Sequence, residues 1–211
     1  MSKSENWPIS EDLLSNIFPL VFEHDNKFSS PWSLLDYLLD QLEKQVKEDK
    51  IGKNVSISKY SLIDGPVWIE DNVTIDAFTS IKGPTFIGKG AYIGNNSLIR
   101  QSMIGKNTLI GFATEIGRSV ISNNCMFHRN SFLDSLACSK TSLGGWTGTA
   151  NIRLDKKEIQ GKEKRGVIIG SNTSLGAKCE IMPGVFIGSN CIIGPNKVIF
   201  KNISDNTKLI K

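Results

Sequence analysis

An aliphatic residue recurs at every sixth position along most of the chain after residue 50. The positions form three runs: Ile51, Ile57, Ile63, Ile69, Ile75, Ile81, Ile87, Ile93 and Ile99; then, after a slip of one residue, Ile104, Ile110 and Ile116; and finally Ile169, Leu175, Ile181, Ile187, Ile193 and Ile199. A small or β-branched residue usually lies two positions before the aliphatic residue, and glycine often follows it. Chance does not keep such a pattern in frame for so many successive steps.

A period of six fits neither the 3.6-residue period of an α-helix nor the simple alternation of a strand. It fits a short strand and a turn, repeated, in which glycine tolerates the turn conformation at little steric cost. Three such units close a triangular coil, and the inward aliphatic residues of stacked coils fill its interior. The pattern therefore predicts an all-β fold, a parallel β-helix of hexapeptide repeats. Cys179 and Cys191 occupy the small interior position, so we expect them to pack rather than to react.

The residues before the repeat have helix-like apolar spacing, over 9–23 and 32–47. Ser30 followed by Pro31 is typical of a helix N-cap and first helical position. The second helix carries an apolar stripe that needs a partner surface, made of Leu34, Leu35, Leu38, Leu39, Leu42 and Val46. A subunit interface would suit this stripe, but we expect the helix to cover the open end of the β-helix core.

The repeat becomes irregular after Ile116 and gives way to the segment 151–166, NIRLDKKEIQGKEKRG, which has six basic and three acidic residues. A β-helix tolerates an extruded loop because the loop interrupts the core at only one corner, and long loops in compact domains are often functional. A basic loop suits phosphate groups, and a merely solvated loop fits equally well. The predicted organisation is a helical extension over 1–50, a β-helix over 51–203 with this extruded loop, and a C-terminal tail over 204–211.

The composition narrows the possible partners. The net charge of +4, from 25 basic and 21 acidic residues, is too small to indicate nucleic-acid binding but suits a small anionic ligand. The four cysteines form no CxxC pair, which favours a reduced, cytoplasmic setting. No apolar run approaches the roughly 20 residues that span a bilayer. We therefore expect a soluble cytoplasmic protein with no membrane or nucleic-acid partner.

The two histidines, His24 and His128, are the candidates for acid–base chemistry. A lone histidine usually has no special role, but His128 lies just before the broken repeat and the basic loop, which makes it the better candidate for a general base near pH 7. A zinc carbonic anhydrase on this fold needs three histidine ligands, and this chain offers too few. We expect no metal.

Several phrases of the chain are more specific than the repeat: Leu98-Ile-Arg100, Ile110-Gly-Phe-Ala-Thr-Glu115, His128 with Asp134-Ser135 after it, Ala150-Asn-Ile-Arg153 followed by Asp155-Lys-Lys-Glu158, and Ile181-Met-Pro-Gly184. With them the segment from about Ile87 onward resembles the acetyltransferase β-helix domain of bifunctional sugar-1-phosphate nucleotidyltransferases. The likeness covers roughly half of the chain. Nothing before Ile51 resembles the nucleotidyltransferase domain of that family.

This resemblance implies a left-handed coil, a homotrimer with active sites between subunits, and transfer of acetyl from acetyl-CoA to the amine of an amino-sugar phosphate such as glucosamine 1-phosphate. It implies that His128 is the general base and that Asn151 orients the sugar or the reacting amine. The cations that would hold the sugar phosphate are Arg100, Arg118 and the loop residue Lys157. The acetyl-CoA chain would lie along Gly145, Ala177 and Pro195.

The chain also departs from the family pattern. Ser131 replaces a tyrosine, Gln160 replaces a second loop lysine, a lysine expected near Gly117 is missing, and the spacing from Ile121 to His128 is one residue short. These departures keep a second hypothesis open, a non-catalytic trimeric scaffold or ligand-binding module. The enzyme hypothesis requires Arg100, His128 and Asn151 to converge on one cleft, and scattered positions would favour the scaffold.

Overall fold

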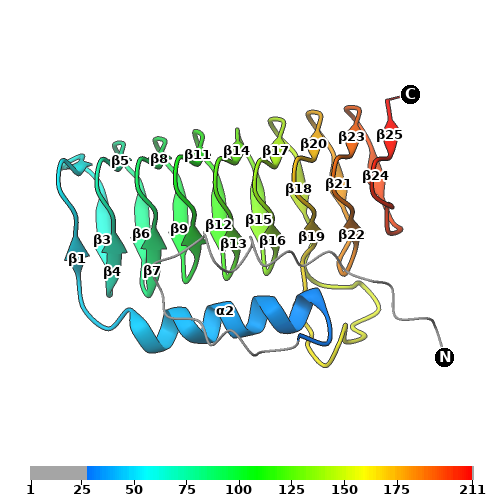
Figure 1. The fold of residues 1–211 in the computed structure, drawn as a ribbon, viewed down its shortest axis with the longest axis horizontal. Helices are drawn as coiled ribbons and strands as arrows, with labels where there is room; N and C mark the ends of the chain where they lie inside the picture. The colour runs from blue at the N-terminus through cyan, green and yellow to red at the C-terminus, as the bar shows by residue number, and fades with distance from the viewer. Residues whose placement is uncertain (1–27, 211) are drawn as a thin grey trace.

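The computed structural model describes residues 28–210 as a triangular prism of short parallel strands with one helix along its side (Figure 1). Nearly every strand pairs in parallel with the strand three places further along the chain, so that three sheets form the three faces. The chain is thus a left-handed parallel β-helix, as the six-residue period and the resemblance predict.

We name the three faces sheets A, B and C, in the order in which the chain reaches them. Sheet A contains β1 (Lys50–Ile51), β4 (Val67–Ile69), β7 (Thr85–Ile87), β10 (Met103–Ile104), β13 (Val120–Ile121), β16 (Leu136–Ala137), β19 (Ile168–Ile169) and β22 (Phe186–Ile187). Sheet B contains β2 (Ser56–Ile57), β5 (Thr74–Ile75), β8 (Tyr92–Ile93), β11 (Leu109–Ile110), β14 (Met126–Phe127), β17 (Ser142–Leu143), β20 (Ser174–Leu175), β23 (Ile192–Ile193) and β25 (Lys208–Leu209). Sheet C contains β3 (Leu62–Asp64), β6 (Ser80–Lys82), β9 (Leu98–Arg100), β12 (Glu115–Gly117), β15 (Ser131–Leu133), β18 (Gly148–Thr149), β21 (Glu180–Ile181) and β24 (Val198–Ile199).

The C-terminal segment corrects one expected boundary. Strand β25 pairs with β23, and Ile203 bridges to Ile187, so the coil continues into the segment that we expected to be a tail over 204–211. The residues in register there, Ile203 and Leu209, are still aliphatic, but Ile203 follows Ile199 by four positions instead of six, so the six-residue pattern stops at Ile199.

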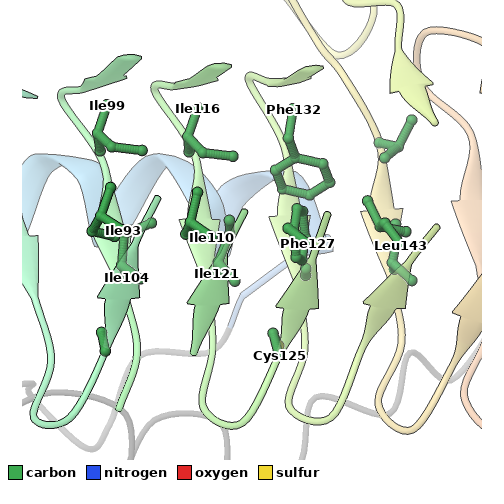
Figure 2. Packing of buried hydrophobic residues seen from close by; sticks show 14 of the residues in the cluster. Ile93, Ile99, Ile104, Ile110, Ile116, Ile121, Cys125, Phe127, Phe132 and Leu143 are labelled. Atoms are coloured by element: carbon green, nitrogen blue, oxygen red, sulfur yellow. The ribbon is translucent and has the colours of Figure 1, made fainter. Parts of the chain in front are cut away.

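The periodic aliphatic residues fill the interior of the prism (Figure 2). Residues in register on successive coils stack directly on one another, as Ile99, Ile116 and Phe132 do on sheet C. Cys179 and Cys191 are fully buried among them, and their thiols point to the carbonyl oxygens of Gly194 (3.3 Å) and Ser204 (3.2 Å). Both cysteines have the packing role that their position in the repeat predicts.

The glycines of the repeat serve a different purpose from the one expected. The glycines after the inward residues have ordinary backbone angles, and the left-handed turn positions are taken largely by asparagine, as at Asn107 and Asn124. Glycine is needed because coils approach closely: a Cβ on Gly88 would lie 2.7 Å from the backbone nitrogen of Lys106. The coil spacing of about 4.8 Å leaves no room for a side chain at that point.

Helix α2 (Pro31–Gln45) does not cover the open end of the core, and that expectation is wrong. It lies along the prism, parallel to the long axis and against the outer face of sheet A (Figure 1). Its apolar stripe packs on a second column of apolar residues, the outward side chains of sheet A: Phe86, Met103, Val120, Leu136 and Ile168. Ser30 caps the helix and Pro31 begins it, as predicted. The helix expected over 9–23 lies outside the described residues.

Across residues 28–210, α2 is too short and too polar to cross a membrane, and no other helix there could do so.

We predict that Leu38→Ala destabilises the protein by about 2–5 kcal/mol, because the side chain is fully buried between α2 and sheet A. The measurement is urea unfolding followed by circular dichroism. Glu43→Ala, on the exposed side of the same helix, is the control and should change the free energy of unfolding by no more than about 0.5 kcal/mol. Equal effects of the two substitutions would contradict the packing of α2 on sheet A.

Candidate functional site

The turns that lead from sheet B to sheet C form one edge of the prism, which we call the B–C edge. His128 lies here, between β14 and β15. Its turn holds three residues, His128 to Asn130, whereas the turns of the coils before and after hold four, 111–114 and 144–147. The turn that holds His128 is therefore one residue shorter than the equivalent turns of its two neighbouring coils.

The short turn holds the backbone of His128 firmly while leaving its imidazole exposed. The His128 amide donates to the Leu143 carbonyl (3.3 Å), and its carbonyl accepts from the Thr114 hydroxyl (2.9 Å). The buried Asn130 side chain ties the turn to the next coil by donating to the carbonyls of Gly144 and Thr147, each at 2.9 Å. The anchored backbone thus holds the imidazole at a defined place on the surface, and a general base needs such a position.

The three residues expected along acetyl-CoA continue this edge toward the C-terminus. Gly145, Ala177 and Pro195 occupy the equivalent position in successive coils, because Lys178 donates to the Gly145 carbonyl and Asn196 to the Ala177 carbonyl, each at 3.0 Å. A Cβ on Gly145 would meet no atom of residues 28–210 within 4 Å. In the described part of the chain nothing accepts a hydrogen bond from the Gly145 amide. The column is therefore an open surface that begins one coil beyond His128.

Sequence reasoning missed the neighbours of His128 on this edge. The Arg129 guanidinium lies 3.7 Å from the ring centroid of Trp146 and 5.3 Å from that of Phe112. Both rings are more than half exposed. The aromatic residues Phe112 and Trp146, in the turns just before and just after the turn that holds Arg129, were the available signal.

The turns from sheet C to sheet A form the opposite edge of sheet C, which we call the C–A edge, and they hold the other predicted residues. Arg118 makes a bidentate contact to Asp134, with Nε at 2.6 Å and Nη2 at 2.7 Å, and the Asn151 amide donates to the same carboxylate at 2.6 Å. The hydrogen bonds that Arg118 donates to the Asp134 carboxylate raise the pKa of Arg118 above its ordinary value. Arg118 and Asn151 thus meet on one carboxylate.

Arg100 lies at the end of β9, on the same side of sheet C, and its Nη2 donates to Glu115 at 2.7 Å. Its guanidinium lies across Gly117, where a Cβ would come within 2.9 Å of Arg100 Cζ. The space that a larger residue at position 117 would need is filled by Arg100.

The loop 151–166 leaves the prism at the C–A edge and folds onto the start of α2. Its ends are held together because Arg165 donates its amide proton to the Asn151 carbonyl at 2.9 Å. The nearly buried Arg165 guanidinium makes two hydrogen bonds to Asp36 of α2, at 2.7 and 2.8 Å, and Lys162 reaches the same carboxylate at 2.6 Å. The predicted binding residue Lys157 is exposed on the loop. Docking on α2 thus neutralises part of the basic charge that suggested a phosphate site.

A cleft opens between α2 and the C–A edge. It consists of two adjoining cavities of about 330 and 240 Å³ that share Asp36, Leu39, Arg118 and Lys162 in their walls. Asp134 also lines the smaller cavity, so Arg118 faces this cleft together with the carboxylate that binds Asn151.

Within one chain the predicted residues fall into two groups. Arg100, Arg118 and Asn151 lie toward the C–A edge, whereas His128 lies on the B–C edge with Gly145, Ala177 and Pro195. One chain alone does not bring Arg100, His128 and Asn151 into one cleft. Among residues 28–210, no group of three or more His, Cys, Asp or Glu side chains is arranged to hold a metal ion.

The known families and proteins that this chain resembles agree with one another. The family model "Bacterial transferase hexapeptide (six repeats)" matches residues 66–101 and 166–201. The bifunctional protein GlmU of Methanocaldococcus jannaschii is 34% identical over 207 residues, covering 88% of this chain and 47% of that protein. The chain thus spans about half the length of this relative. The uncharacterized acetyltransferase YaiX of Escherichia coli is 34% identical over 190 residues, covering 82% of this chain and 83% of that protein.

Among solved structures, LpxA of Bacteroides fragilis, a UDP-N-acetylglucosamine acyltransferase, superposes with a TM-score of 0.65 at 24% identity, covering 75% of this chain and 65% of that one. At this identity the similarity supports the fold.

We predict that Asp36→Asn lowers the free energy of unfolding at pH 7 by about 2 kcal/mol, because it leaves the nearly buried Arg165 without its carboxylate. Burial raises the pKa of Asp36, but hydrogen bonds from Arg165 and Lys162 outweigh burial and lower the pKa below its ordinary value. The stabilisation of the fold by the ionised Asp36 carboxylate is therefore fully present above the unfolded-state pKa of about 4. It is lost as the pH falls through the lower folded-state pKa.

Urea unfolding between pH 7 and pH 2.5 checks this prediction, and the difference between wild type and variant should shrink at the acid end. Asp40→Asn, one turn further along α2 in an exposed pair with Lys44, is the matched control, with an expected effect below about 0.5 kcal/mol. A difference that does not depend on pH would show that the ion pair is not its cause.

Proposed function

Because the chain belongs to the hexapeptide-repeat acetyltransferase family, we propose that it transfers the acetyl group of acetyl-CoA to the amine of an amino-sugar phosphate. The observation that carries this proposal is the B–C edge. An exposed imidazole on a fixed backbone lies at the head of an open column, with room for an extended chain over Gly145.

The chemistry needs few groups, because a thioester is already activated. The amine nitrogen of the acceptor forms a bond to the thioester carbonyl carbon, and His128 takes the proton that this nitrogen loses. The unpaired Gly145 amide is available to the oxyanion of the tetrahedral intermediate. The C–S bond then breaks, and His128 returns the proton to the departing thiolate of CoA. Holding the two substrates side by side supplies the rest of the acceleration.

We further propose that the active site is completed by a neighbouring copy in a homotrimer. Helix α2 covers sheet A in each chain, and no helix among residues 28–210 covers sheets B and C, which leaves these two sheets for contact with other copies. In a ring of three prisms, the C–A edge of one copy, with Arg100, Arg118, Asn151 and Lys157, can face the B–C edge of the next. A ring of this kind uses a heterologous interface, in which each copy contributes a different edge to each of two sites. The four cysteines carry no disulfide, which suits a reducing cytoplasm.

We predict that His128→Ala and Asn151→Ala each lower acetyl transfer at least about 100-fold, because each removes a group from the reaction. When the two variants are unfolded and refolded together, activity should return to about a quarter of the wild-type value. In randomly mixed rings, half of the copies carry an intact His128, half of their neighbours carry an intact Asn151, and one site in four is therefore complete. The assay follows thiol release from acetyl-CoA with glucosamine 1-phosphate and other amino sugars.

His24→Ala, which removes the other histidine of the chain, is the control for the loss of an imidazole. Mixed variants that show no more activity than the two variants assayed separately would rule out a site shared between copies. Wild-type protein that neither turns over any acceptor nor binds acetyl-CoA in calorimetry would overturn the enzyme proposal, and a trimeric scaffold would then be the better description.

A further inference from the structure

Three arginines flank sheet C, and they differ in what their guanidinium groups contact. Arg118 places Nε and Nη2 on Asp134, and Arg100 places Nη2 on Glu115. Each of these two guanidinium groups is therefore paired with a carboxylate of the protein, which already neutralises much of its charge. Among residues 28–210, no carboxylate or carbonyl accepts a hydrogen bond from the Arg129 side chain, so its charge is uncompensated by the described part of the chain.

Arg129 is nevertheless held in place. Trp146 and Phe112 belong to the coils on either side, and the guanidinium lies between them, 3.7 Å and 5.3 Å from the two ring centroids. Such stacking uses the faces of the planar group and leaves the N–H donors in its plane free to bind. An oriented guanidinium with free in-plane donors matches two oxygens of a phosphate.

The position of Arg129 fixes which substrate could present that phosphate. Arg129 follows His128 directly, and it occupies the position that Gly145, Ala177 and Pro195 take in the following coils. The reacting end of acetyl-CoA must lie near the base, and this end, with the pantetheine arm behind it, is uncharged. The phosphates of the coenzyme therefore lie further away, and an anion beside His128 belongs to the acceptor.

We propose that Arg129, held between Phe112 and Trp146, binds the phosphate of the acceptor and selects phosphorylated over neutral amino sugars. This inference rests on the proposed acetyl transfer and assigns the anion site to a residue of the B–C edge. The Phe112 and Trp146 rings act through Arg129, because they lower the cost of ordering its long side chain when the phosphate binds.

The test is steady-state kinetics of Arg129→Gln with two acceptors, glucosamine 1-phosphate and glucosamine. Loss of a charge-assisted pair should raise the KM for glucosamine 1-phosphate about tenfold or more, with little change in kcat. The KM for glucosamine should not change, since it has no phosphate. Arg129→Lys should recover part of the loss, because a lysine supplies the charge without the bidentate geometry. Lys59→Gln removes a cation that stacks on Tyr60 at the same edge, several coils away, and should leave both values unchanged.

Equal effects on both acceptors would overturn the inference, and so would a rise in the KM for acetyl-CoA alone, which would assign the anion to the coenzyme. If the wild type turns over no acceptor, acetyl transfer fails and the anion site is judged separately by calorimetry. Binding of glucosamine 1-phosphate to wild type but not to Arg129→Gln would uphold the site, and equal binding or none would overturn it.

Discussion

The parallel register between successive coils is the constraint on which the rest of this structure depends. Each coil places its residues directly over those of the coil before it, so side chains about 16 to 18 positions apart become neighbours. A chemical feature on this fold is therefore a column along one edge or face. The B–C edge shows this most clearly, because His128 and Arg129 belong to one coil, and Phe112, Trp146, Gly145, Ala177 and Pro195 are added by coils before and after it.

The same constraint explains why one face of the prism is closed. The outward positions of sheet A repeat a large apolar residue from coil to coil, and α2 covers this column with its own apolar stripe. The loop 151–166 then fastens the start of the helix through Asp36, Lys162 and Arg165. Among residues 28–210, no helix packs on sheets B and C, and a shared active site would have to form along their edges.

The fold could be predicted because its period is local and strict. The helix could be predicted as well, but not the surface against which it packs. That surface is a column of apolar residues in sheet A, each of which directly precedes an inward residue, and the pattern analysis did not recognise it. The column consists of Trp68, Phe86, Met103, Val120, Leu136, Ile168 and Phe186. With the coil register known, that column can be read from the sequence.

The site was only partly predictable, for a related reason. The family motifs predict His128 and Asn151 as site residues, but the motifs do not give the edge on which each residue lies. The contacts from Asp36 to Arg165 join segments 129 residues apart, and no period connects a loop to a helix. The Arg129 stack required knowledge that the turn after His128 is one residue short, because this deletion sets which side chains become neighbours.

The central claim, that the B–C edge is the acetyl-CoA surface, is tested most directly by calorimetry of acetyl-CoA binding to Gly145→Ala and Gly145→Phe. The space around Gly145 accepts a Cβ without contact, so both variants should fold as the wild type does. The account predicts near-normal affinity for the alanine variant and loss of binding for the phenylalanine variant, whose ring would occupy the path of the pantetheine chain. Unchanged binding by Gly145→Phe, in a protein of unchanged stability, would contradict it.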